Sequence, residues 1–332
     1  MITFRPYKDA IDFDEIKRQR RSLNTQIEVK REVMIPRYPE DREEIEKAIA
    51  ELQAKIPELD AILAKEPPPP ELPPCKPLIK VSGVLEEFET LCVIGYFTDR
   101  EYDPVAFARK EERNQFGALL LAMAGNSAGA AITSQTEDRR SDVCDFVRGK
   151  INGIPFHGWL GFTVAKAGDY VELAVTEQEG HYLVYAIAHP ELRVISMTPR
   201  CKQGIHSNAK YQVRGNWYCF LFFMFFYMMI DVFFVKMDII EYMKYVCFFC
   251  TLAAGILSPF IYFSCMRNPK PTFRLAEEIF TALGFPNPTE VNLQKFTKKK
   301  LKEIKANSLD GNSSIGRVLP DRHCLLSYFY YY

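Results

Sequence analysis

Excess charge of one sign is absent from this sequence. Its 332 residues hold 42 Lys and Arg against 42 Asp and Glu, so the formal net charge is zero. Proteins that bind nucleic acid with their whole surface carry a basic excess, so we expect no nucleic-acid partner. Disorder of the whole chain is excluded as well, because 48% of the residues are hydrophobic and 25% are charged.

Cysteine and histidine are sparse, and neither shows the spacing of a metal-binding or catalytic motif. Nine Cys are too few for a disulfide scaffold, and none of the five His belongs to an H-E-x-x-H pair. Cys247 and Cys250 form a C-x-x-C, but they lie in an apolar run and lack a second ligand pair. No nucleophile elbow or Walker A loop occurs. We therefore predict no catalytic residue, metal or cofactor, and the sequence gives no positive indication of an enzyme.

A secretory signal is also lacking. The first 21 residues are polar and contain no apolar core of about 7–15 residues. We expect the soluble parts to stay in the cytoplasm, unless another route exports them.

Residues 1–65 predict a helical hairpin. A first helical stretch covers about 13–33, and an apolar ladder with steps of 4 and 3 follows it. The ladder consists of Ile45, Ile49, Leu52, Ile56, Leu59 and Leu63. Pro57 should kink or break the second helix. A two-helix packing element and an oligomerising coiled coil both fit this pattern.

Residues 66–77 hold seven of the 21 Pro. Because Pro fixes φ and lacks an N–H donor, this composition predicts a stiff polyproline spacer at a domain boundary. A site for a Pro-reading domain is the alternative.

Residues 78–210 predict an α+β domain with a small antiparallel barrel, OB-like or SH3-like. Extended runs begin at Leu78, a helix fits 104–123, and Asn152-Gly153 is a hairpin signal. Short strands follow at 170–175, 181–188 and 192–197, with turn residues between them.

Two long apolar runs predict a transmembrane hairpin over residues 217–266. Trp217 to Val235 has one charge, Asp231, and Tyr245 to Met266 has none. Either run is long enough to cross about 30 Å of hydrocarbon, and Lys236 to Lys244 would connect them. A buried core hairpin is the alternative. Pro259 is a candidate kink in the second span.

Asp231 lies four residues from the end of the first span. It either snorkels to the interface or acts as a buried acid that pairs with a neighbour.

Basic residues flank the hairpin and predict its orientation. Seven lie outside it: Arg200, Lys202, Lys210, Arg214, Arg267, Lys270 and Arg274. The connection holds two, Lys236 and Lys244. The positive-inside rule then places both flanks in the cytoplasm.

Residues 267–332 predict a short amphipathic helix and a basic tail. Phe273, Ala276, Ile279, Phe280 and Leu283 share one helical face. The six Lys between 295 and 305 either bind anionic lipid or form a solvated helix face. Elsewhere, the segment Phe116 to Ala131 is either a marginal membrane element or a soluble helix followed by a loop. The aromatic C-terminus has no physical account at the level of sequence.

The order of motifs in residues 79–283 resembles bacterial type VI secretion system effectors. The matching motifs are Asp103-Pro-Val-Ala-Phe-Ala-Arg109, Gly158-Trp159, Ala167-Gly-Asp-Tyr-Val-Glu172, Val184-Tyr-Ala-Ile187, Pro199-Arg-Cys-Lys-Gln-Gly204, Arg274-Leu-Ala-Glu-Glu-Ile279 and Leu283-Gly-Phe285. The resemblance implies an effector that acts at a membrane, and it carries over no catalytic residue.

Three functions follow from these features. The first is a secreted toxin that perturbs a membrane without catalysis. The second is a resident inner-membrane immunity or scaffold protein of a secretion locus, which fits the basic flanks. The third, an enzyme on the barrel, has no motif to support it. The expected partners are the lipid bilayer and a secretion-apparatus or cognate toxin or immunity protein; the oligomeric state stays open.

Overall fold

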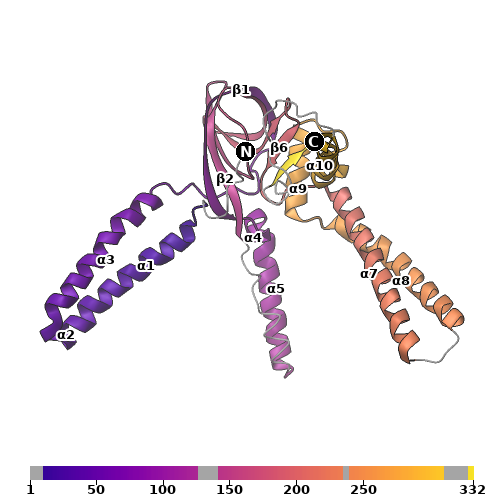
Figure 1. Cartoon of the computed structure of the whole chain (residues 1–332), viewed down its shortest axis with the longest axis horizontal. Coiled ribbons are helices and arrows are strands. Elements are labelled where there is room, and N and C mark those ends of the chain that lie inside the picture. Colours follow the sequence, from indigo (N-terminus) through magenta and orange to yellow (C-terminus); the bar gives the residue numbers. More distant parts are fainter. Residues whose placement is uncertain (1–9, 126–140, 235–238, 310–327) are drawn as a thin grey trace.

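The computed structural model describes residues 10–125, 141–234, 239–309 and 328–332. Figure 1 shows a head built around a β-sheet, from which helical arms project toward the lower side of the view. The arms are the α1–α3 hairpin, the helix α5, and the α7–α8 hairpin.

The N-terminal arm is a helical hairpin with a small apolar seam. It consists of α1 (Phe13–Val29), a π turn η2 (Lys30–Met34), α2 (Ile35–Arg37), a 3-10 turn η3 (Pro39–Asp41) and α3 (Arg42–Leu63). Ile27 packs against Ile45 and Ile49, and all three are buried. Of the kink or break expected at Pro57, a break does not occur, because α3 continues through this residue.

The head is built on a closed barrel of five strands, so the prediction of an α+β chain with a small barrel is confirmed. Its strands are β1 (Ile79–Tyr96), β2 (Ser141–Ile151), β3 (Ile154–Leu160), β4 (Tyr170–Gln178) and β5 (His181–His189). The sheet order is β3-β2-β1-β4-β5, and a parallel pairing of β3 with β5 closes the ring.

Two features of the backbone allow the ring to close. β1 pairs with β4 up to Val84 and with β2 from Leu85 onward, with a bulge between Leu85 and Glu87 at the changeover. Asn152 and Gly153 both have positive φ, at 52° and 77°, and join β2 to β3 as the Asn-Gly pair predicts.

The helices between β1 and β2 are α4 (Asp99–Tyr102) and α5 (Pro104–Met123). α5 has the predicted bounds. The Asp103 side chain caps it by accepting from the Ala106 N–H at 2.9 Å, and Pro104 occupies its first turn.

Two apolar clusters make up the core of the head. One draws residues from all five barrel strands, among them Leu85, Val147, Phe156, Leu173 and Ile187, and fills the barrel. The other joins strand residues to the inward face of α9 (Pro271–Ala282).

The C-terminal residues complete the head. α9 buries Phe273, Ala276, Ile279 and Phe280, which is the predicted amphipathic face. The 3-10 turn η4 (Pro288–Glu290) and α10 (Leu293–Leu309) follow, and β7 (Phe329–Tyr331) pairs with β6 (Val194–Met197) at the edge of the sheet. The α+β unit therefore does not end at residue 210, and 267–332 is not simply an amphipathic helix and a basic tail. The aromatic C-terminus is a buried strand.

The Pro-rich strap, residues 66–77, lies against the barrel. The Trp159 Nε1 donates to the Pro68 carbonyl at 2.9 Å, and the Tyr185 hydroxyl donates to the Glu71 carbonyl at 3.0 Å. Leu72 packs against the core. The predicted stiff spacer thus packs against the head along its length and ties the N-terminal arm to it.

Candidate membrane-anchoring hairpin

The two predicted spans lie within two long helices, α7 (Ile205–Phe234) and α8 (Ile239–Arg267). α7 contains Trp217 and Asp231, and α8 contains Tyr245, Pro259 and Met266; Val235 lies outside the described residues. The predicted connection from Lys236 to Lys244 is too long, since α8 already begins at Ile239. Pro259 does not interrupt α8.

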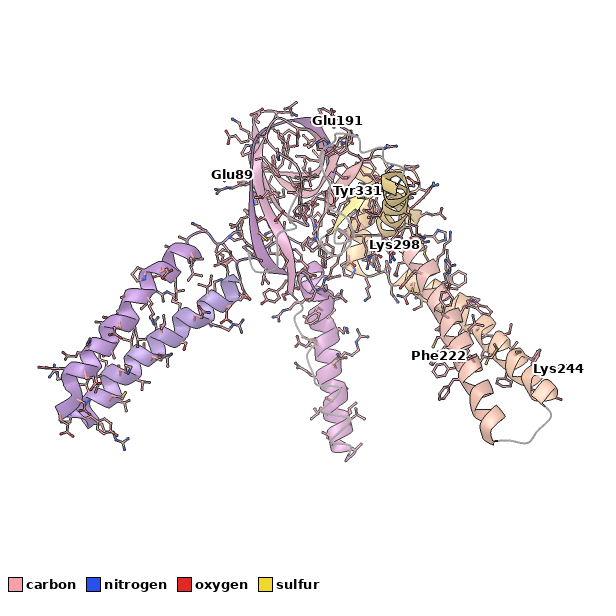
Figure 2. The ribbon with its side chains drawn as sticks, viewed as in Figure 1. Glu89, Glu191, Phe222, Lys244, Lys298 and Tyr331 are labelled. Carbon is pink, nitrogen blue, oxygen red and sulfur yellow. The ribbon has the colours of Figure 1, made fainter. Side chains whose placement is uncertain are left out.

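The outward faces of this hairpin are apolar and exposed. Phe225 is 57% exposed, Ile256 65% and Phe260 76%. Further exposed apolar residues of the two helices are Leu221, Phe222, Phe223, Phe226, Phe248, Phe249, Leu252, Leu257 and Phe263. Figure 2 shows Phe222 on the side of α7 that is turned away from α8. A water-soluble monomer rarely exposes a continuous apolar surface of this kind, and such a surface marks a site of contact with lipid or with another protein.

Small residues hold the two helices together. Ala254 and Ser258 are buried, one turn apart on α8. The Ser258 hydroxyl donates to the Ala254 carbonyl at 2.6 Å and accepts from the Asn216 amide at 3.4 Å. Small residues four apart, with a polar contact between helices, are typical of helix pairs in lipid. The large side chains are thereby left on the outside.

The base of the hairpin is anchored in the head by buried amides. The Asn292 Nδ2 donates to the Gln203 Oε1 at 2.9 Å and to the Ser207 hydroxyl at 3.0 Å. The Gln203 Nε2 in turn donates to the Asn208 Oδ1 at 3.1 Å. A buried network with its partners satisfied holds one geometry, so this joint fixes the angle at which α7 leaves the head.

Backbone contacts reinforce the joint. The Glu277 carboxylate of α9 accepts from the Ile205 N–H at 2.7 Å and caps α7. Gly204 lies so close to the 3-10 turn η4 that a Cβ would stand 2.4 Å from the Thr289 carbonyl oxygen. Only glycine fits there without a shift of the backbone. This joint was missed at the sequence level; Gln203 and Gly204 stood in a motif of the resemblance, but nothing local pointed to their partners.

The seven predicted topology residues divide into two groups. Arg200 is half-buried in an ion pair with Asp142 at 2.7 Å, and Lys202 is half-buried beside α10. The other five, Lys210, Arg214, Arg267, Lys270 and Arg274, are exposed around the base of the hairpin. Lys210 pairs with Glu290 at 3.0 Å, and the Arg214 guanidinium lies 5.9 Å from the Tyr218 ring centre. We call these five residues the basic collar.

α10 brings further positive charge to the same end of the head. Burial lowers the pKa of Lys202, and repulsion from Lys298 of α10 lowers it further. Figure 2 places Lys298 near the start of α7, whereas Lys244 lies near the far end of α8. Positive charge is thus concentrated at the end of the hairpin that joins the head.

Length and composition single out one candidate span among the described residues, Cys247–Arg267 of α8. The described residues contain no group of three or more His, Cys, Asp or Glu that could hold a metal ion.

Comparisons with protein-family models, curated proteins and solved structures give no match for this chain. The resemblance to type VI secretion effectors therefore stays a prediction.

Proposed function

We propose that this chain is a membrane protein in which the α7–α8 hairpin spans a bilayer and holds the barrel head at its surface. The exposed phenylalanines of both helices carry the proposal. From Trp217 to Phe234, α7 is about 27 Å long at 1.5 Å per residue, and Tyr245 to Met266 of α8 is about 33 Å. Both lengths match a hydrocarbon layer of about 30 Å.

The head lies on the cytoplasmic side of a bacterial inner membrane in this proposal. The basic collar stands at the base of the hairpin, and Lys and Arg within about 15–20 residues of a span set its orientation. The joint at Gln203 and Asn292 then fixes the head against the surface.

Charged substitutions at the middle of each span test this role. Phe225→Asp and Ile256→Asp each replace an exposed apolar side chain, at a cost of about 2.5–3.5 kcal/mol for a mid-membrane Asp. We expect the double variant to lose resistance to alkaline carbonate extraction from membranes. Tyr211→Asp, on the exposed proximal part of α7, is the matched control and should remain integrated. Equal extraction of the double variant, the Tyr211→Asp control and the unaltered protein would contradict the proposal.

The cellular role has two candidates. The motif order of residues 79–283 favours an effector that enters a target membrane and perturbs it, whereas the basic collar favours a resident immunity or scaffold protein. Expression with and without a periplasm-directing signal distinguishes them. An effector should stop growth and collapse the membrane potential only from the periplasm. A resident protein should be tolerated in both cases.

A further inference from the structure

The outer end of helix α5 carries exposed apolar side chains. We call Phe116, Leu119, Leu120 and Met123 the α5 tip; Phe116 is 61% exposed and Met123 77%. Among the described elements, α4 is the one that packs extensively against α5. α5 therefore extends from the head with these four side chains exposed, while Ala118 between them is buried.

Polarity changes along α5 in the same sense as along α7. The half next to the head carries exposed charges at Arg109, Lys110, Glu112 and Arg113, and the apolar residues begin at Phe116. In α7, likewise, the part next to the head is polar and the exposed phenylalanines begin further out. In both helices the apolar part is thus the part farthest from the head.

The arrangement of the arms places these apolar parts on one side of the molecule. Figure 1 shows α5 and the α7–α8 hairpin leaving the head toward the same side. The N-terminal arm differs, because its far end holds a run of charged residues, Glu40, Asp41, Arg42, Glu43 and Glu44. Among the described parts of these arms, exposed apolar side chains therefore dominate the outer half of α5 and the hairpin helices.

We infer that the α5 tip enters the bilayer that the α7–α8 hairpin spans. It inserts into the leaflet next to the head, as a second and shallower membrane contact. The inference rests on the proposed function of the hairpin. Phe116 to Met123 is about 12 Å long, which is enough to cross a headgroup layer of about 5–7 Å and reach acyl chains. The charged half of α5 would then span the gap between head and membrane.

Two contacts restrict the head more than one does. The amide joint fixes the angle between hairpin and head, and the α5 tip adds a contact on the other side of the head's lower surface. The head would therefore keep one face toward the lipid.

Depth-dependent quenching of tryptophan tests the inference. The background is Trp217→Phe, which leaves Trp159 in the head as a constant emitter. Met123→Trp places a probe in the α5 tip, and Val105→Trp places the matched probe in the first turn of the same helix, where the side chain is 60% exposed. The full chain is reconstituted in phosphatidylcholine and phosphatidylglycerol vesicles with and without brominated acyl chains, and flotation shows first whether the protein is bound.

We expect a blue shift and a loss of M123W emission with brominated lipid, and no change for V105W. If neither variant floats, the hairpin proposal itself fails. If both float and M123W is quenched no more than V105W, the α5 contact is wrong while the hairpin stands. A blue-shifted M123W emission that brominated lipid leaves unchanged would also overturn it, because a protein and not lipid would then cover the tip.

Discussion

Arg200, Asp142 and Tyr328 join three distant parts of the chain. Asp142 is the second residue of β2, Arg200 follows β6 and Tyr328 precedes β7. The Arg200 Nε donates to the Asp142 Oδ2 at 2.8 Å, and the Tyr328 hydroxyl donates to the Asp142 Oδ1. Burial alone would lower the Arg200 pKa, but the charge of Asp142 and its hydrogen bond outweigh burial and raise it. Burial and the bond to Asp142 raise the pKa of Tyr328.

Asp142→Asn should destabilise the head by about 1.5–3 kcal/mol, the usual worth of a hydrogen bond to a charged group. Arg200 has a φ of 69° and would be left in this strained conformation without its ion pair. Thermal unfolding in detergent measures the loss. The control is Glu89→Gln, which breaks the exposed pair with Arg148 and should cost about 0–1 kcal/mol. Equal losses in the two variants would refute a special role for Asp142.

His157 makes the head sensitive to acid. Burial, and then repulsion from His181, lower its pKa; the two rings are stacked with their centres 5.2 Å apart. The folded state therefore favours neutral His157. Above about pH 6.5, the ordinary pKa of His, this residue does not reduce the stability of the fold. Stability should fall as the pH drops below this value through the lowered pKa, since the unfolded chain binds the proton more readily.

His157→Gln should therefore flatten the loss of stability between about pH 7 and 5. His181→Gln removes only the second cause and should have a smaller effect of the same sign. Chemical unfolding followed at several pH values measures both. An unchanged pH dependence in His157→Gln would show that another group controls the acid response.

At the scale of the strands, closure of the barrel depends on Gly158. This residue lies in β3 where the strand passes β5, and a Cβ there would stand 2.2 Å from the Val184 carbonyl oxygen. Gly158→Ala should cost about 1–3 kcal/mol by forcing the strands apart. Gly215→Ala, in the exposed proximal part of α7 with open space around it, should instead stabilise by up to about 1 kcal/mol. Shifts of the unfolding midpoint in opposite directions for the two variants would support this account. An unchanged midpoint for Gly158→Ala would contradict it.

Local signals predicted most of the elements, and long-range contacts account for what they missed. The helix at 104–123 and the turn at Asn152-Gly153 follow from Pro, Asn and Gly chemistry that acts within a few residues. β7 was missed because three aromatic residues become a strand only when β6 supplies its partner. The composition of the Pro-rich strap predicted its stiffness, but not its contacts with Trp159 and Tyr185.

The candidate site, too, was predictable from the sequence only in part. Apolar runs and flanking charge predicted the hairpin from composition alone. The seam at Ser258 and the amide joint depend on side chains that are 42 and 85 or more residues apart in the chain. Such pairings have no local signature. For the same reason, Arg200 was counted as a topology charge although Asp142, 58 residues away, pairs with it.

At the scale of the whole molecule, the head and the hairpin form one unit. α7 begins at the head, where Glu277 of α9 accepts from the Ile205 N–H, and α9, which follows α8, packs in the core of the head. The head is therefore assembled from residues on both sides of the hairpin. In the proposed membrane arrangement both flanks must therefore lie on the same side of the bilayer, which an even number of spans permits.

Cysteine accessibility in intact cells tests this topology most directly. The accessible native Cys are replaced first; the buried Cys144 and Cys201 can stay, because burial raises the pKa of the Cys201 thiol to about 12 and keeps it unreactive. Asp238→Cys lies between α7 and α8, whereas Gln212→Cys and Asn268→Cys lie at exposed positions near the head.

An impermeant maleimide should label D238C in intact cells, and Q212C and N268C only after lysis. Labelling of Q212C and N268C in intact cells while D238C stays protected would contradict the orientation. Labelling of all three sites only after lysis would contradict a spanning hairpin.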